Sequence, residues 1–251
     1  MKKKDHDAIR LDRLLSALAL GTRTQVQNLI RSGRITVNQK AVFKPESHVN
    51  ASDAVALDGQ ALDTRLSRHI MLNKPCGVLT AARDPRQPTV IDLLPPIFES
   101  LGCMPVGRLD KDTEGLLLLT TDGTLAHQIL SPRRQVWKTY RAVVDGPLSG
   151  EDVLAFERGL ALSDFTALPA RLTILRSSGT EAEALVDVCE GKYHQVRRMF
   201  EARGRIVTAL KRLAIGPISL DESLAVGEYR ELTEAELRAI RQAVSGEKYA
   251  E

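Results

Sequence analysis

The chain has 251 residues, of which 43% are hydrophobic and 27% charged, a composition typical of a soluble protein with one large or two smaller domains. Its apolar runs fall short of the roughly 20 residues that a membrane helix needs, and the charged run Lys2–Asp5 precedes no apolar segment, so we expect neither membrane anchor nor secretory signal. Cys76, Cys103 and Cys189 lie far apart without a CxxC pair. We therefore expect a cytoplasmic protein with no zinc site and no disulfide framework.

The net charge of +3 is unevenly distributed. Residues 1–67 carry 11 lysines and arginines against 7 acidic residues, whereas the remainder carries 24 against 25. The amino-terminal quarter therefore holds the positive excess. Such a local bias suits a phosphate backbone, although a solvated helix face produces the same pattern.

The first 63 residues predict a compact αα-ββ module. Apolar residues recur at helical spacing over residues 9–20, which Gly21 ends. Thr22 is expected to cap a second helix that ends at Gly33. Two strand-and-turn units follow, at residues 35–42 and 55–59.

The second of these helices carries a basic stripe. Together with the following hairpin it resembles the alpha-L RNA-binding module, through Arg10-Leu11-Asp12-Arg13-Leu14-Leu15, Thr22-Arg23 and the run from Ile30 to Asn38. Two positions depart from that pattern, because Thr22 replaces a serine and Asn38-Gln39 replaces the usual Asn-Gly turn. The resemblance implies RNA binding through exposed cations, namely Arg10, Arg13, Arg23, Arg31 and Arg34.

After a polar linker at residues 64–68, a second domain is expected over residues 69–244, with a frayed tail at 245–251. Strands are predicted at residues 69–79, 116–119, 139–144, 170–175 and 184–188, with a turn at Asp122-Gly123. Helices are predicted at 150–159, at 193–203 and from the Thr233/Glu236 capping box to residue 244. Strands with few helices between them indicate an α+β domain around a largely antiparallel sheet.

One carboxylate stands out in this domain. Asp110 ends the segment Gly107-Arg108-Leu109-Asp110, shortly before the apolar run Leu116–Leu119. A carboxylate on a short loop against a buried strand is held in place, as a reactive group must be. The alternative is an ion pair with Arg108 or a cap of the loop.

Four motifs, one of them the Asp110 segment, occur in order along the chain: Lys74-Pro75; Gly107–Asp110 with Thr113–Leu118; Lys138-Thr139-Tyr140; and the run from Glu190 to Phe200. This set resembles the rRNA pseudouridine synthases of the ribosomal small-subunit pseudouridine synthase A family. Gly216-Pro217 and Gly227–Arg230 also match. The resemblance implies isomerisation of uridine to pseudouridine, in which the N1–C1′ bond breaks and the uracil rejoins the sugar through C5. That reaction needs no metal, nucleotide or other cofactor.

The resemblance also implies roles for individual residues. Asp110 is the catalytic carboxylate, acting either as a nucleophile or as a base on the sugar. Tyr140 stacks under the uracil and helps to take the proton from C5. Arg197 holds the Asp110 carboxylate bidentately, and His194 has no acid–base part. Lys74 and Arg108 shape the site or contact RNA, and the remaining cations contact phosphates or are solvated: Lys192, Arg198, Lys211 and Arg212.

The expected partner is ribosomal RNA or an assembling subunit, bound by a monomer. The target base is turned out into a pocket while the amino-terminal module adds phosphate contacts. Ser131-Pro132-Arg133-Arg134 and Ala167–Ala170 favour 16S rRNA. Relatives that act on 23S rRNA share most of these motifs, and a non-catalytic RNA-binding assembly factor on the same scaffold is the competing class.

Overall fold

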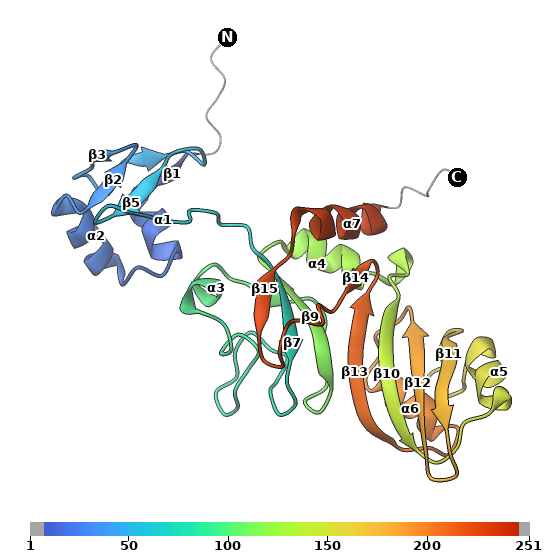
Figure 1. Cartoon of the computed structure of the whole chain (residues 1–251). Helices are drawn as coiled ribbons and strands as arrows, with labels where there is room; N and C mark the ends of the chain where they lie inside the picture. The colour runs from blue at the N-terminus through green and yellow to red at the C-terminus, as the bar shows by residue number, and fades with distance from the viewer. Residues whose placement is uncertain (1–7, 246–251) are drawn as a thin grey trace. The chain divides into compact units, whose positions relative to one another are not determined.

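The computed structural model describes residues 8–245 (Figure 1). The described chain forms two units. The first contains the residues up to Arg68 together with Leu94–Cys103, and the second contains His69–Leu93 and the residues from Met104 onward. The tail predicted at 245–251 lies outside the described residues except for Ser245, which ends the last helix.

The first unit has the predicted αα-ββ arrangement. Its elements are β1 (Ile9–Arg10), α1 (Leu11–Ala17), α2 (Arg23–Arg31), β2 (Ile35–Val37), β3 (Lys40–Ala41), β4 (His48–Val49), β5 (Val55–Leu57) and β6 (Gln60–Ala61). The strands β3-β2-β5-β6 form an antiparallel sheet. Thr22 caps α2 as expected, because its hydroxyl accepts from the Gln25 amide while Gln25 Oε1 accepts from the Thr22 amide at 2.8 Å. Asn38 and Gln39 both have positive φ, 50° and 67°, as a two-residue type I′ hairpin turn requires.

A later segment completes this unit. Helix α3 (Pro96–Ser100) was not predicted. Its Ile97 packs against the core of the first unit, and Ser100 Oγ donates to the Ser16 carbonyl at 3.1 Å. Residues 94–103 therefore belong to the first unit by contact, although the sequence places them within the range 69–244.

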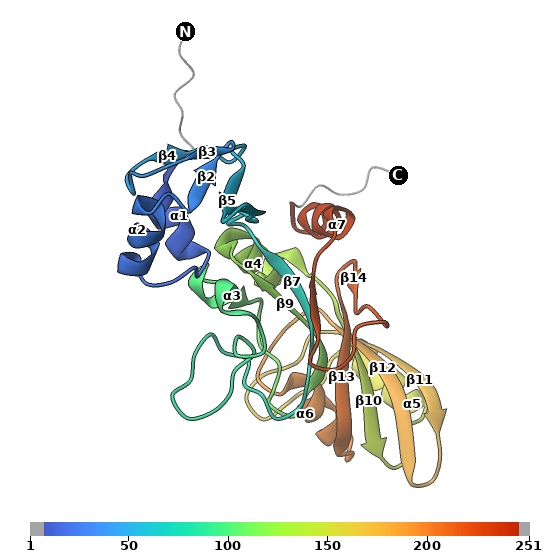
Figure 2. The same ribbon diagram turned by 60° about the vertical axis from the view of Figure 1, so that its left-hand side comes forward.

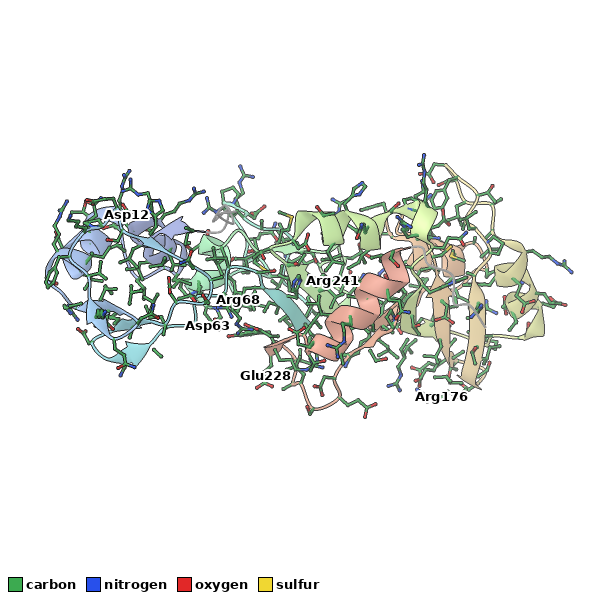
Figure 3. All side chains as sticks on the ribbon, turned by 90° about the horizontal axis from the view of Figure 1, so that it is seen from above. Asp12, Asp63, Arg68, Arg176, Glu228 and Arg241 are labelled. Atoms are coloured by element: carbon green, nitrogen blue, oxygen red, sulfur yellow. The ribbon has the colours of Figure 1, made fainter. Side chains whose placement is uncertain are left out.

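The segment between the units has no regular structure but is held by one carboxylate. Asp63 Oδ2 accepts from Arg68 Nη1 at 2.8 Å and from Arg65 Nη2 at 2.6 Å. Figure 3 labels Asp63 and Arg68. The hydrogen bond from Arg65 and the second from Arg68 hold the pKa of the Asp63 carboxyl far below its usual range.

The second unit is an α+β domain built on one large sheet. Its main strand order is β11-β12-β10-β13-β9-β7-β15, antiparallel throughout except for the parallel pair β13/β9. The strands are β7 (His69–Lys74), β8 (Met104–Pro105), β9 (Glu114–Thr120), β10 (Lys138–Asp145), β11 (Arg171–Ser177), β12 (Glu181–Val188), β13 (Val207–Ile215), β14 (Ile218–Ser219) and β15 (Tyr229–Glu231). The helices are α4 (Gly123–Leu130), η1 (Pro132–Arg134), α5 (Gly150–Arg158), α6 (Gln195–Glu201) and α7 (Glu234–Ser245).

Several elements of this unit differ from the prediction. β7 ends at Lys74, because Pro75 cannot donate to a strand ladder. The expected turn at Asp122-Gly123 instead starts helix α4, since Asp122 Oδ1 accepts from the Leu125 amide at 3.0 Å. Strand β13 was not predicted, although it joins β10 to β9 in the middle of the sheet.

The helices lie against the sheet in two groups (Figure 2), and each group shares an apolar core with the strands. Helices α5 and α6 pack on β10, β12 and β13, with the Phe156 and Phe200 rings 5.1 Å apart. Helices α4 and α7 pack near β7 and β9 around Leu116, Leu118 and Ile240. None of the described helices is long and apolar enough to cross a membrane.

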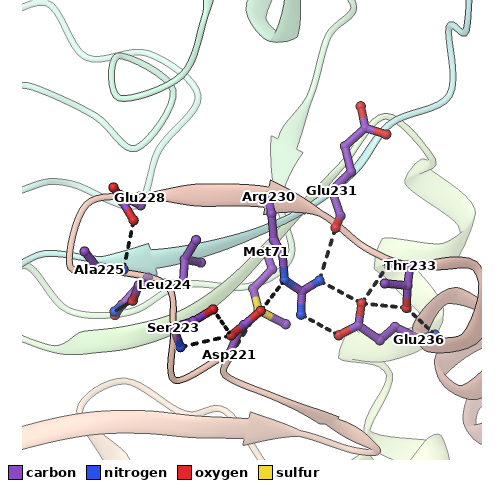
Figure 4. Close-up of polar contacts among 11 residues, drawn as sticks. Met71, Asp221, Ser223, Leu224, Ala225, Glu228, Arg230, Glu231, Thr233 and Glu236 are labelled. Atoms are coloured by element: carbon purple, nitrogen blue, oxygen red, sulfur yellow. Dashed lines mark hydrogen bonds and ion pairs between the residues drawn. The ribbon is translucent and has the colours of Figure 1, made fainter.

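A polar cluster fastens α7 to the sheet edge (Figure 4). Arg230, on β15, donates from Nε to Asp221 Oδ2 at 2.7 Å and to both Glu236 carboxylate oxygens at 2.8 Å. Glu236 also accepts from the Thr233 amide at 2.7 Å, which confirms the predicted capping box. The hydrogen bond from Arg230 lowers the pKa of Glu236 to about 2.

Candidate active site

The loop that carries Asp110 runs from β8 to β9 and is fastened to the segment after β7. The Thr80 hydroxyl donates to the Leu109 carbonyl at 2.7 Å and accepts from the Leu109 amide at 3.2 Å. The Gly77 amide donates to the Lys111 carbonyl at 2.8 Å, and the Thr113 amide donates to the Asp110 carbonyl at 3.1 Å. The loop is therefore fixed on both sides of the carboxylate, as the sequence indicated.

Beneath this loop lies a fully buried lysine. The Lys74 ammonium contacts four backbone carbonyls at 2.9–3.4 Å, those of Pro75, Asp110, Lys111 and Thr113. Burial lowers the pKa of Lys74. An ammonium enclosed in this way cannot reach an RNA phosphate, so its assignment to RNA contact was wrong. Its structural part is to hold the Asp110 loop.

The Asp110 side chain faces a pocket and keeps 26% of its surface exposed. The pocket lies between the Asp110 loop, β10, the end of β12, the start of α6 and β13. Its walls include Arg108, Asp110, Thr113, Tyr140, Val188, Lys192, His194 and Leu210. The structure thus brings the predicted residues Asp110, Tyr140, Arg108 and Lys192 to one cavity.

The imidazole of His194 lies close to the Asp110 carboxylate. His194 Nε2 lies 3.4 Å from Asp110 Oδ1. Its backbone has φ 50°, a left-handed conformation that ends the loop before α6. The family resemblance implied no acid–base part for His194, because it assigns that work to Asp110 and Tyr140.

Tyr140 is backed by a buried arginine. Arg212 faces Tyr140 across the β10/β13 ladder and donates from Nη1 to the phenol oxygen at 3.4 Å and from Nε to the Leu116 carbonyl at 2.8 Å. Its Nη2 has no hydrogen-bond partner among the described residues. The interpretation of Arg212 as a phosphate contact or solvated charge was wrong, since only 4% of the residue is exposed. Its position in a strand, two residues after Leu210, is the signal that would have placed it inside.

Arg197 does not hold Asp110 as the resemblance implied. Its Nη2 pairs with Asp112 Oδ2 at 2.9 Å, and its Nη1 donates to the Val207 carbonyl at 2.9 Å. The expected bidentate grip on Asp110 is therefore replaced by a pairing two residues further along the same loop. Arg197 still links α6 to the Asp110 loop.

The other cations predicted to contact RNA differ in whether they are exposed and in whether they already pair with a carboxylate. Arg108 and Lys192 are exposed at the pocket, whereas Arg198 is paired with Asp164 and donates to Ser163 Oγ at 3.0 Å. In the first unit Arg10 pairs with Asp12 at 2.8 Å, and Arg34 donates to Asp58 Oδ1 at 2.9 Å. Arg13, Arg23 and Arg31 are also exposed there.

Comparison with known proteins agrees with these features. A family model described as RNA pseudouridylate synthase matches residues 68–202, more than half of the chain, and an S4 domain model matches residues 9–55. The chain is 42% identical to a Bacillus subtilis protein named uncharacterized RNA pseudouridine synthase, over 93% of this chain and 99% of that one. It is 37% identical to a Vibrio cholerae protein named ribosomal small subunit pseudouridine synthase A, over 92% and 99%.

A solved structure leads to the same family. A crystal structure of a pseudouridylate synthase covers 92% of this chain and 99% of its own, with 33% identity and a TM-score of 0.64. The matched ranges include the Asp110 loop, Tyr140 and the start of α6. This chain therefore belongs to the RNA pseudouridine synthases, a family of isomerases.

Proposed function

We propose that this enzyme isomerises a uridine of small-subunit (16S) ribosomal RNA, with Asp110 as the catalytic carboxylate. The observation that carries the proposal is the shared pocket, which both Asp110 and Tyr140 line. The choice of 16S rRNA is supported by the motifs around residues 131–134 and 167–170 and by the name of the Vibrio cholerae relative.

The chemistry follows from the groups that face this pocket. A uridine turned out of the RNA enters it and lies against the Tyr140 ring, since aromatic side chains stack on unpaired bases. Asp110 then attacks the nucleotide as a nucleophile or removes a sugar proton as a base. The N1–C1′ bond breaks and a C5–C1′ bond forms; N1 gains a proton and C5 loses one, so substrate and product are isomers.

Two residues support this chemistry without touching the base. Lys74 fixes the Asp110 loop through its carbonyls, and Arg212 holds the phenol oxygen of Tyr140. In this proposal the phenol oxygen of Tyr140 takes the C5 proton while its own proton passes to solvent, and the guanidinium of Arg212 stabilises the partial negative charge on that oxygen during the transfer. Such fixed supports keep reacting groups aligned.

The exposed arginines of the first unit supply affinity for the RNA backbone. Phosphate contacts position a nucleic acid without reading its bases, and their contribution falls as salt rises. In this proposal Arg13, Arg23 and Arg31 hold the rRNA, and the pocket of the second unit selects the uridine.

The test is a pseudouridine map of rRNA from cells that lack the gene. We expect one 16S position to lose its pseudouridine and to regain it on complementation with the wild-type gene, but not with Asp110→Asn. Loss of a 23S position instead would refute the 16S assignment. An unchanged map in both rRNAs would refute the proposed substrate altogether.

A further inference from the structure

Beside the pocket stands an aromatic ring that the chemistry above does not use. Tyr193 is 70% exposed, although the residues on either side of it, Lys192 and His194, both line the pocket. Its ring is stacked on the His194 imidazole, with centroids 3.8 Å apart and an interplanar angle of 16°. The imidazole covers one face of the phenol ring, and the high exposure leaves the other face to the solvent.

The segment that presents this ring is braced from several sides. Arg198 Nη1 donates to the Tyr193 carbonyl at 3.4 Å. The buried Gln195 accepts from the Lys192 amide at 3.2 Å and donates to Glu190 Oε2 at 2.9 Å. A ring on a braced loop, backed by a second ring, loses little conformational freedom when something stacks on it.

The surroundings of the ring point to RNA as its partner. Arg108 and Lys192, both exposed, line the same pocket, and exposed cations beside an aromatic face are the pattern of single-stranded nucleic-acid sites. The ring is also linked to the reacting group, because its stacking partner His194 lies 3.4 Å from Asp110 Oδ1. Whatever stacks on Tyr193 therefore lies next to the nucleotide in the pocket.

Turning a uridine out of the RNA removes the stacking partner of the base next to it. The loss of that stacking is unfavourable. A flat ring at the edge of the pocket replaces that lost partner.

We propose that Tyr193, backed by His194, is a stacking platform for an unpaired nucleobase adjacent to the target uridine. This inference rests on the proposed function, since it concerns the same rRNA substrate. The platform contributes to binding of the RNA and takes no part in the bond changes.

The substrate is total rRNA purified from cells that lack the gene. The experiment measures kcat and KM on this substrate for the purified wild-type enzyme and for the variants Tyr193→Phe, Tyr193→Trp and Tyr193→Ala. Stacking of one base is worth about 5- to 150-fold in affinity. We therefore expect Tyr193→Ala to raise KM by about that factor with kcat within about twofold of wild type, and Phe and Trp to preserve KM. Leu175→Ala, which truncates a half-exposed apolar residue on β11, is the matched control and should change neither constant.

Salt separates stacking from charge. The ratio of KM between Tyr193→Ala and wild type should stay constant between about 50 and about 200 mM salt, whereas Lys192→Gln should flatten the salt dependence. The platform is overturned if Tyr193→Ala leaves KM unchanged, if Tyr193→Phe weakens binding as much as Tyr193→Ala, or if the ratio collapses with salt. Failure of the proposed 16S target is distinguishable, because mapping the converted uridine identifies the rRNA while the variants are compared on the same mixture.

Discussion

The seam between β9 and β13 offers the sharpest test of how this fold positions its site. A Cβ added to Gly115 would lie 2.2 Å from the Arg212 carbonyl oxygen and 2.9 Å from the Arg212 amide nitrogen. Gly115 also has φ 96°, where side chains other than glycine are strained. We predict that Gly115→Ala forces the two backbones apart and disturbs both the Asp110 loop and Arg212.

The magnitude follows from two costs. The left-handed conformation costs an alanine about 1–2 kcal/mol. Relieving the contact requires a shift of roughly 1 Å, which breaks the two-residue parallel pairing of Gly115 with Arg212 and Glu114 with Lys211 and loses about 1 kcal/mol for each hydrogen bond. We expect a total loss of about 3–4 kcal/mol of unfolding free energy.

Urea unfolding followed by tryptophan fluorescence reports on the second unit, which contains both β9 and β13. The single tryptophan of the chain, Trp137, lies directly before β10 of that unit. Gly204→Ala is the matched control: its φ is 70° but its added Cβ meets nothing within 4 Å. It should therefore cost only the strain, about 1–2 kcal/mol. Equal losses in the two variants would refute the close approach of the strands.

Three further predictions concern single side chains. Lys74→Met should lose about 2–4 kcal/mol of unfolding free energy and most of the turnover, because the carbonyls of the Asp110 loop lose their donor. Urea unfolding and single-turnover kinetics measure the two effects, and an unfolding free energy and rate equal to those of wild type would contradict the prediction. Arg212→Lys should lower kcat about 10- to 100-fold with unchanged KM for RNA, since an ammonium cannot replace both guanidinium contacts; an unchanged kcat argues against support of Tyr140. Arg230 lowers the pKa of Glu236 from 4.5 to about 2. Wild type should therefore have a higher unfolding free energy than Glu236→Gln above pH 4.5, and this difference should disappear as the pH falls through 2. A difference in unfolding free energy that stays constant from pH 7 to pH 2 would refute that pairing.

The sequence predicted those parts of the fold that local signals determine. Thr22 and the Thr233/Glu236 pair cap their helices by contacts three residues apart, and the run from Leu116 to Leu119 is a buried strand. Strand β13 escaped prediction because Lys211 and Arg212 interrupt its apolar pattern, although Arg212 is buried.

In the candidate site, too, the sequence predicted the residues that lie in local motifs but not the long-range contacts between them. Asp110 and Tyr140 were found through motifs, and the structure brings them to one pocket. The contacts that support them were missed because they join distant segments: Lys74 holds carbonyls from residues 110 to 113, and Arg197 pairs with Asp112 across 85 residues. Sequence motifs identify reactive residues, but which cation supports which loop depends on tertiary packing.

The central claim is that Asp110 performs the bond exchange. The most direct measurement is release of tritium from rRNA labelled at C5 of uridine, under single-turnover conditions, with purified Asp110→Asn and with Asp112→Asn as the neighbouring carboxylate control. We predict that Asp110→Asn slows tritium release by at least about 10³-fold while RNA binding persists, and that Asp112→Asn slows it by no more than about tenfold. Turnover by Asp110→Asn at a rate similar to that of Asp112→Asn would contradict the assignment.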